Sequence, residues 1–244
     1  MWALVTGAAS GLGLAVSERL AQAGYRVLAT DVRAAPPSSL ASAVEQSNGR
    51  YTPLDVAHPE SWQSALADLD DPISRLHLNA GIQIAPPEAP MSDYRFESMQ
   101  IARYRQMMGV NVDGVVFGLH FCLPHMAKGD AIVATASLAG ITPYDVDPLY
   151  SMSKHAVVGL VRSMVRECAE REVRINALCP GGIDTGIIPE AQRAAAPVDA
   201  FMTPEHVAEE VMHLFATEES GKTWTKVRAD KPAWIIRAPG DRSA

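Results

Sequence analysis

Short apolar runs alternate with longer amphipathic stretches along the chain. The apolar runs predict β-strands at 3–6, 26–30, 51–54, 76–79, 131–136, 174–178 and 234–237. The amphipathic stretches predict helices at 11–24, 39–47, 59–69, 97–127, 149–171 and 203–217. Apolar strands that alternate with helices of 3.6-residue period are typical of a parallel sheet covered on both faces. The pattern therefore predicts an α/β protein with a doubly wound Rossmann fold, a parallel sheet of about seven strands and helices on both faces.

A proline in the third predicted strand indicates the order of the sheet. Pro53 has no N–H to donate to a ladder, and prolines in sheets belong on edge strands. The strand order 3-2-1-4-5-6 places the third strand at such an edge. No repeat and no Pro/Gly/Ser-rich linker divides the 244 residues. We expect one nucleotide-binding and catalytic domain over 1–244, with a substrate-side loop at 182–202.

The composition argues against several classes of partner. A net charge of −7 without a basic stripe does not suit nucleic acid. No uninterrupted apolar run approaches the about 18–20 residues that span a bilayer. A strand begins at the third residue, so we expect no signal peptide. Cys122, Cys168 and Cys179 are widely separated and show no metal spacing. We expect a cytoplasmic protein with reduced cysteines, no metal site and no membrane partner.

A glycine-rich turn follows the first predicted strand and opens the first predicted helix. It contains Gly7, Gly11 and Gly13, and Asp31 ends the second strand eighteen residues later. Small residues let a pyrophosphate approach the backbone, and the N–H groups at a helix N-terminus favour the anion. An acid after the second strand can bind the hydroxyls of an adenosine ribose. This arrangement predicts a dinucleotide site in which the backbone at Ser10 faces phosphate.

Three side chains carry acid–base chemistry. Tyr150 and Lys154 are separated by four residues on a predicted helix and therefore share one face. The pKa of a free tyrosine is about 10, and a neighbouring ammonium group favours the phenolate and lowers that pKa. We expect Tyr150 to act as the acid–base. Ser137 ends the fifth predicted strand, where its hydroxyl can hold a substrate oxygen against Tyr150.

Several motifs together resemble the short-chain dehydrogenase/reductase family, and the resemblance covers nearly the whole chain. They are Thr6-Gly7-x-x-x-Gly11-x-Gly13, Asn79-Ala80-Gly81, Asn111, Ser137, Tyr150-x-x-x-Lys154, and Pro180-Gly181 with Thr185. The resemblance implies a catalytic set of Asn111, Ser137, Tyr150 and Lys154. It implies that Lys154 also holds the nicotinamide ribose and that Asn111 supports a water-linked proton relay.

The cofactor site implied by the glycine-rich turn and the resemblance is larger than the turn. Its residues are Gly7, Ser10, Gly11, Leu12, Gly13, Asp31, Asp55, Val56, Asn79, Ala80, Gly81, Tyr150, Lys154, Pro180, Gly181, Ile183 and Thr185. Asp55 and Val56 match the pair that contacts adenine, and Ile183 and Thr185 are expected at the nicotinamide carboxamide. Because Asp31 would repel the extra phosphate of NADP, we expect the cofactor to be NAD.

The chain departs from the family's pattern at two places. Leu78 stands where members often carry a second asparagine. At the C-terminus, two strand-like runs, 224–228 and 233–237, replace the short Asp-Gly-Gly ending. This ending resembles the branch of prostaglandin dehydrogenases, which have a modified C-terminal strand, and it puts the common tetramer in doubt.

The motifs predict interconversion of a secondary alcohol and a ketone. Apolar residues that follow the catalytic motifs predict a cyclic or lipid-like substrate. They are Leu138, Ile141, Pro143, Tyr144, Val146, Ile187, Ile188 and Met202. Two alternatives stay open: an epimerase or dehydratase on the same scaffold, and an NAD-binding regulator without turnover.

The two longest predicted helices carry more apolar residues than one sheet face can cover. These are Val110, Val112, Val115, Val116, Phe117, Val157, Val158, Leu160, Val161 and Met164. Exposed apolar area of this kind marks an interface. We expect a homodimer or homotetramer, with the dimer as the first choice.

Overall fold

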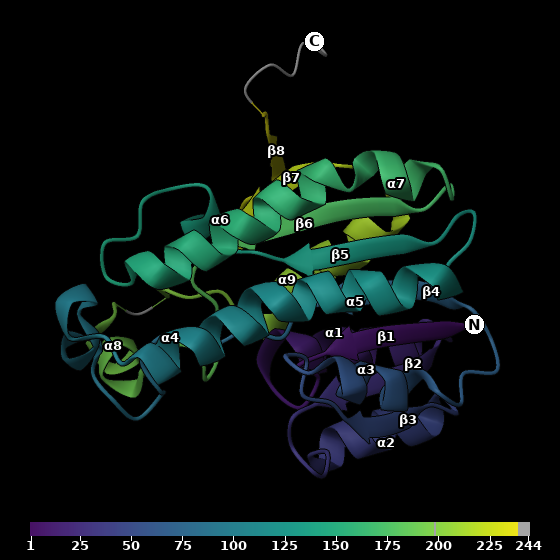
Figure 1. Cartoon of the computed structure of the whole chain (residues 1–244), viewed down its shortest axis with the longest axis horizontal. Helices are drawn as coiled ribbons and strands as arrows, with labels where there is room; N and C mark the ends of the chain where they lie inside the picture. The colour runs from purple at the N-terminus through teal and green to yellow at the C-terminus, as the bar shows by residue number, and fades with distance from the viewer. Residues whose placement is uncertain (198, 239–244) are drawn as a thin grey trace.

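Eight strands form one sheet with the order β3-β2-β1-β4-β5-β6-β7-β8 (Figure 1). The computed structural model describes residues 1–197 and 199–238, so residue 198 of the loop 182–202 and residues 239–244 lie outside it. The strands are β1 Trp2–Thr6, β2 Arg26–Asp31, β3 Arg50–Pro53, β4 Ile73–Leu78, β5 Ala131–Thr135, β6 Arg174–Pro180, β7 Thr223–Lys226 and β8 Trp234–Ile236. Neighbours from β3 to β7 pair in parallel. Pro53 ends the edge strand, as predicted.

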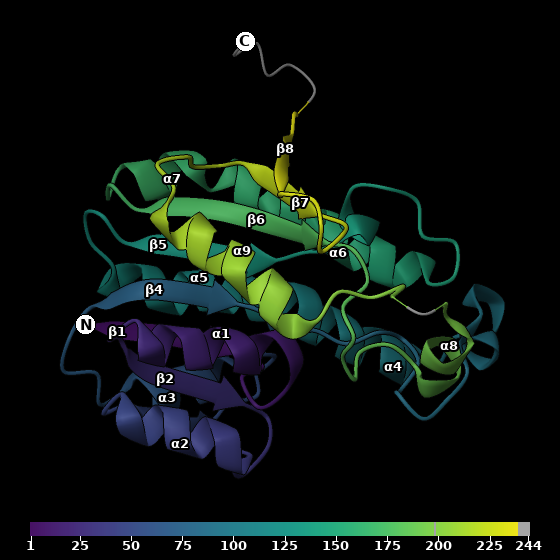
Figure 2. The same ribbon diagram turned by 180° about the vertical axis from the view of Figure 1, so that it is seen from behind.

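Helices cover both faces of the sheet, as the periodicity predicts. They are α1 Gly11–Gln22, α2 Ser38–Gln46, α3 Pro59–Leu66, α4 Ile101–Met108, α5 Gly114–Cys122, α6 Pro148–Ser163, α7 Val165–Ala169, α8 Glu190–Ala195 and α9 Pro204–Ala216. One buried apolar cluster joins α3, α5 and α6 to the sheet. A second cluster joins α1, α2 and α9 to the opposite face (Figure 2). The two clusters make a three-layer α/β/α core.

The helix predicted over 97–127 is interrupted. α4 begins only at Ile101, and a π-helical turn over Gly109–Asp113 separates it from α5. A Cβ atom at Gly114 would lie 2.7 Å from Cγ2 of Val56, so the backbone here presses on the loop after β3. The predicted helix 149–171 also divides, into α6 and α7. Periodicity does not report such breaks, because the apolar side chains continue through them.

Part of the expected apolar interface belongs to the core instead. Val115, Val157, Val158 and Val161 are buried against the sheet, so they cannot contribute to an interface. Val116 remains exposed at 40%, and Met152 on α6, which was not among the residues predicted from the sequence, is 43% exposed. The outward apolar area on α5 and α6 is therefore smaller than the sequence predicts.

One helical stretch has the length and composition of a membrane span, contrary to the expectation from uninterrupted apolar runs. It covers Ile101–His125 with a mean hydropathy of 1.3, and 44% of that window is buried inside the protein. Val115, Leu119 and Cys122 within it pack into the core under the sheet. A core helix passes this composition test as readily as a span does, so the match is weak evidence for a membrane.

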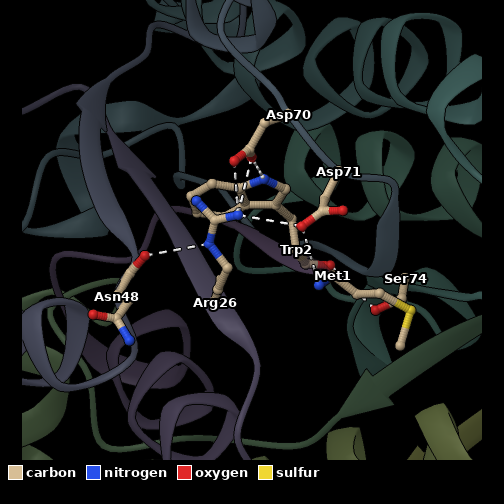
Figure 3. A network of polar contacts seen from close by, with 7 residues as sticks. All are labelled: Met1, Trp2, Arg26, Asn48, Asp70, Asp71 and Ser74. Carbon is tan, nitrogen blue, oxygen red and sulfur yellow. Dashed lines mark hydrogen bonds and ion pairs between the residues drawn. The ribbon is translucent and has the colours of Figure 1, made fainter.

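A polar network lies at the amino-terminal ends of β1 and β2 (Figure 3). The guanidinium of Arg26 stacks 4.0 Å from the centre of the Trp2 ring. The indole Nε1–H of Trp2 donates to Asp70 at 2.9 Å, and Arg26 pairs with both Asp70 and Asp71. These contacts join the starts of β1 and β2 to the loop before β4, at the opposite end of the strands from the glycine-rich turn.

The two C-terminal strand-like runs form a hairpin, and β8 pairs antiparallel with β7. Within residues 1–197 and 199–238 the sheet therefore has eight strands rather than about seven, and the last is not parallel. Lys226 at the end of β7 holds the turn: its Nζ donates to the carbonyls of Lys231 at 2.5 Å and Ala229 at 3.5 Å. The same Nζ lies 3.1 Å from Oε1 of Glu210 on α9, with both side chains largely buried.

Lys226→Met is expected to lower the free energy of unfolding by about 3 kcal/mol, because it leaves Glu210 largely buried without its cation. Denaturant unfolding measures the loss, and hydrogen exchange should show lost protection over 227–236. The double variant Lys226→Met/Glu210→Leu is the control, since it removes both charges and should recover most of the loss. A single variant within about 1 kcal/mol of wild type would contradict the assignment.

Candidate functional site

The glycine-rich turn adopts backbone angles that side chains disfavour. Gly7 and Gly11 have φ values of 65° and 52°. Gly13 has an ordinary helical backbone, but a Cβ atom there would lie 2.1 Å from the carbonyl oxygen of Gly7. Ser10 begins α1 without a side-chain capping bond, which leaves the first N–H groups of the helix without a side-chain acceptor. The turn can therefore take an anion at its backbone.

Asp31 and Arg33 both bind the glycine-rich turn. Asp31 Oδ2 accepts the N–H of Ala9 at 3.0 Å, and Oδ1 accepts the N–H of Arg33 at 3.1 Å. The guanidinium of Arg33 donates to the carbonyl of Ala9 at 3.0 Å. The carboxylate of Asp31 and the guanidinium of Arg33 thus both bind the backbone of Ala9. Each oxygen of the Asp31 carboxylate keeps a further lone pair that can accept a hydroxyl.

A threonine joins the turn to the end of β4. Thr6 Oγ1 accepts the N–H groups of Asn79 at 2.9 Å and Ala80 at 3.1 Å. The amide of Asn79 donates back to the carbonyl of Thr6 at 3.1 Å. These bonds hold the Asn-Ala-Gly segment against the glycine-rich turn.

A cleft of about 1310 Å³ runs along the carboxyl ends of the strands. Most of the predicted site residues lie on its wall. They are Gly7, Ser10, Gly11, Leu12, Asp31, Asp55, Val56, Asn79, Ala80, Gly81, Ser137, Leu138, Tyr144, Tyr150, Lys154, Pro180, Gly181, Ile183, Thr185, Ile187 and Ile188. Gly13 and Asn111 lie behind the wall, because Gly13 packs under Gly7 and Asn111 faces the backbone of Ile82.

Ser137, Tyr150 and Lys154 meet where β5 ends beside α6. The Ser137 hydroxyl lies near the Tyr150 phenol and lowers its pKa, and Ser137 Oγ accepts the N–H of Ala139 at 3.1 Å. Lys154 is buried, and its Nζ lies 5.6 Å from the centre of the Tyr150 ring and donates to the carbonyl of Thr135 at 3.0 Å. Thr135 Oγ1 in turn lies 2.9 Å from Nε2 of His77. Burial lowers the pKa of His77 to about 3.

The pKa of Tyr150 differs from the sequence prediction. Burial raises its pKa above the usual value, the charge of Asp147 raises it further, and the hydroxyl of Ser137 lowers it. Lys154 does not lower it, because burial brings the pKa of Lys154 down to about 8, so the amine is already neutral at the higher pH where the phenol ionises. At neutral pH the tyrosine is therefore a protonated phenol, ready to donate.

Asn111 supports the loop after β4. It lies in the π-helical turn and is fully buried. Its Oδ1 accepts the N–H of Ile82 at 2.8 Å, and its Nδ2 donates to the Ile82 carbonyl at 2.9 Å and to Ser153 Oγ at 3.0 Å. With its polar atoms engaged by protein groups, Asn111 positions Ile82.

The substrate end of the cleft combines apolar side chains with charged ones, among them Arg103, Glu190 and Arg193. Leu138, Tyr144, Ile187 and Ile188 lie on its wall as predicted, and so does Pro143. Ile141, Val146 and Met202 do not lie on this wall. Val146 points to solvent, and Met202 bridges to Ile183 within the second core cluster. The loop after β4 meets α8 across this end, where the N–H of Glu190 donates to the carbonyl of Pro87 at 2.9 Å.

Three side chains near this site were missed from the sequence. Asp147 caps α6 by accepting the N–H of Tyr150 at 2.9 Å, and Arg103 and Gln83 lie on the cleft wall. The Asp147-Pro148 pair three residues before Tyr150 is a helix-start signal that could have identified the first. Arg103 and Gln83 have no local signal in the sequence. They meet only because α4 lies against the loop after β4, and they are 20 residues apart in the chain.

Comparison with known proteins agrees with this geometry. The sequence profile of the short chain dehydrogenase family matches residues 1–196. Cyclohexanol dehydrogenase from Acinetobacter sp. (strain SE19) is 30% identical over 239 residues, which cover 93% of this chain and 92% of that protein.

Solved structures show the same fold. A dehydrogenase/reductase from Sinorhizobium meliloti 1021 has a TM-score of 0.77 at 28% identity, covering 94% of this chain and 95% of that one. BdcA in complex with NADPH has a TM-score of 0.78 at 21% identity, covering 93% of each chain, and this likeness concerns the fold alone. The profile and the full-length relative show that the chain belongs to the short-chain dehydrogenase family, a family of oxidoreductases that use nicotinamide cofactors.

Proposed function

We propose that this chain is an NAD-dependent oxidoreductase that interconverts a secondary alcohol and its ketone. The observation that carries the proposal is that Ser137, Tyr150 and Lys154 lie on the wall of the same cleft as the glycine-rich turn. The apolar side chains at the substrate end favour a cyclic or lipid-like substrate, and the similarity to a cyclohexanol dehydrogenase supports a ring.

The residues present fit a dinucleotide. The left-handed angle of Gly7 and the uncapped start of α1 suit a diphosphate, held by backbone N–H groups at Gly7, Ser10 and Gly11. Asp31 would bind the adenosine ribose. Asp55 and Val56 would contact adenine. At the other end of the cleft, Ile183 and Thr185 would contact the nicotinamide carboxamide and Lys154 the nicotinamide ribose.

The chain's own residues move and place the proton. The chemistry supplied by a bound nicotinamide dinucleotide is hydride transfer. The Tyr150 hydroxyl gives its proton to the carbonyl oxygen during reduction and takes one from the alcohol during oxidation. The Ser137 hydroxyl holds the same substrate oxygen. Lys154, when charged, stabilises the phenolate, and Asn111 fixes the loop beside them.

Tyr150→Phe is expected to lower kcat by about 10²–10⁴-fold, the usual contribution of an acid–base group. The dissociation constant for NAD should change little, because the phenol contributes little to cofactor binding. Steady-state rates and cofactor fluorescence titration measure the two quantities. Tyr104→Phe is the matched control, since Tyr104 packs on the same apolar cluster away from the cleft wall. A residual kcat above about a tenth of wild type would exclude Tyr150 as the acid–base.

The preference for NAD rests on the position of Asp31. A 2′-phosphate would bring a second negative charge beside this carboxylate, and like charges in contact cost several kcal/mol. Arg33 opposes this effect, because its guanidinium lies on the same loop. It is engaged by the carbonyl of Ala9, whereas Asp31 keeps free lone pairs for a hydroxyl.

Asp31→Ala should raise kcat/KM for NADP relative to NAD by about tenfold or more, which corresponds to at least 1.4 kcal/mol. Arg33→Ala should change the ratio in the opposite direction, since it removes the cation nearest the phosphate. Both ratios come from initial rates with each cofactor. Wild-type preference for NADP, or an unchanged ratio in Asp31→Ala, would show that Asp31 does not select the cofactor.

We propose a homodimer in which the outer faces of α5 and α6 pair with their counterparts. Val116 and Met152 supply exposed apolar area, extended by the partly buried Phe117 and Leu160. The hairpin of β8 covers β7 and argues against a tetramer built through that edge. Sedimentation should show a dimer at micromolar concentration, and Val116→Glu/Met152→Glu should give monomers. A wild-type protein that sediments only as a monomer would rule the interface out.

Other expectations stay predictions. The three buried, free cysteines suit a cytoplasmic location. The hairpin at the C-terminus is compatible with the branch that resembles prostaglandin dehydrogenases. We also propose that 1–244 acts as one catalytic and nucleotide-binding domain, with a small-molecule alcohol or ketone as its partner rather than nucleic acid or a membrane.

A further inference from the structure

One buried carboxylate joins the start of α6 to the loop after β4. Asp147 is only 1% exposed. Its Oδ1 accepts the N–H of Tyr150 at 2.9 Å, and its Oδ2 accepts the N–H of Ile84 at 3.0 Å. Each carboxylate oxygen therefore serves a different segment, although Ile84 and Asp147 are 63 residues apart in the chain.

Helix capping alone does not account for an aspartate at this position. Serine and asparagine cap helices about as well as aspartate, and each does so with one oxygen atom. α9 begins in this way, because the hydroxyl of Thr203 accepts the N–H of His206. A buried carboxylate is costly, and burial raises the pKa of Asp147 while backbone N–H groups lower it. What the carboxylate offers is a second acceptor atom on the same short side chain.

The segment that Asp147 holds is part of the cleft wall. Gln83 and Ala85, on either side of Ile84, both line the cleft. Ile84 itself is buried in the same apolar cluster as Tyr150. Asp147 does not lie on the wall, so it acts on a ligand only through these neighbours.

Other side chains hold the same loop. Asn111 binds the N–H and the carbonyl of Ile82, and Arg103 donates to the carbonyls of Gln83 and Ile84. The bond from Asp147 differs from these, because its second oxygen runs directly to the backbone of Tyr150. It therefore ties the position of the wall to the residue that carries the phenol, as supporting groups in preorganised sites do.

We infer that Asp147 is a positioning residue that fixes the wall at Gln83 and Ala85 relative to the Tyr150 hydroxyl and thereby sets the enantiomer preference of the reaction. The inference rests on the proposed function and deepens it. When the oxygen of a chiral secondary alcohol is held at Tyr150, its two substituents face different parts of the wall. Displacement of the wall therefore affects the two enantiomers unequally, whereas a looser helix or a lost charge slows both to the same extent.

The test uses the full-length enzyme and the separate enantiomers of 1-indanol, 1-phenylethanol and 2-butanol, with NAD and with NADP. For the pair that wild type oxidises fastest, the ratio of the two kcat/KM values is measured in Asp147→Ser and in Asp147→Asn. Both replacements keep one acceptor for the start of α6 and lack the second. We expect kcat/KM for the faster enantiomer to fall about tenfold or more, and the ratio to change about threefold or more. The dissociation constant of the cofactor should change little.

Thr203→Ala is the matched control, because it removes the cap of a helix whose first residues do not bind the loop after β4. It should lower the melting temperature and leave the enantiomer ratio unchanged. The two Asp147 variants are judged separately, so one that fails to fold leaves the other as the test.

A ratio that changes less than about threefold in the folded Asp147 variants would overturn the inference and leave Asp147 as a helix cap. An equal change of the ratio in Thr203→Ala would overturn it too. The proposed oxidoreductase activity would stand in both cases. A wild-type enzyme that oxidises none of these alcohols, and reduces none of the matching ketones with reduced cofactor, would instead refute the proposed function, on which the inference rests.

Discussion

The close approach of α1 to the end of β1 is the constraint on which the site depends. Gly13 has no room for a Cβ atom, since one would lie 2.1 Å from the carbonyl of Gly7. Gly7 in turn lies against Ala80, where a Cβ atom would come within 3.0 Å of the Ala80 Cα. The helix start, the glycine-rich turn and the end of β4 therefore form one packed unit, which Thr6 ties with two hydrogen bonds.

The rest of the site is built outward from this unit by buried polar groups. Asn111, Asp147 and Arg103 each satisfy backbone groups of the loop after β4, so the irregular chain there keeps its hydrogen bonds without a strand partner. Asp147 also satisfies the first turn of α6. Because the same carboxylate serves both segments, Asp147 links the start of α6, which carries Tyr150, directly to the loop after β4.

Burial shifts the pKa values of Tyr150 and Lys154 more strongly than the charges around them do. Tyr150 and Lys154 are both out of solvent, and each is shifted toward its neutral form. The Lys154 ammonium donates to the carbonyl of Thr135 and so is directed at the backbone instead of the phenol.

The sequence alone determined the features that local pattern encodes. Alternating apolar runs and helical periods predicted the sheet, its two helical layers and the edge position of Pro53. Residue type and spacing placed the glycine-rich turn, Asp31, Ser137 and the Tyr150–Lys154 pair on what proved to be one cleft. These signals can be read from the sequence, because each depends on residues within one helical turn or at the end of one strand.

Only the tertiary structure decided how distant segments meet. It placed Gly13 and Asn111 behind the cleft wall, broke the long helix at Gly109–Asp113 and paired β8 antiparallel with β7. It also turned four of the seven expected interface valines toward the core, and brought Arg103 to the carbonyls of Gln83 and Ile84. Each of these outcomes depends on distances of a few ångströms between segments far apart in the chain, and no local periodicity carries that information.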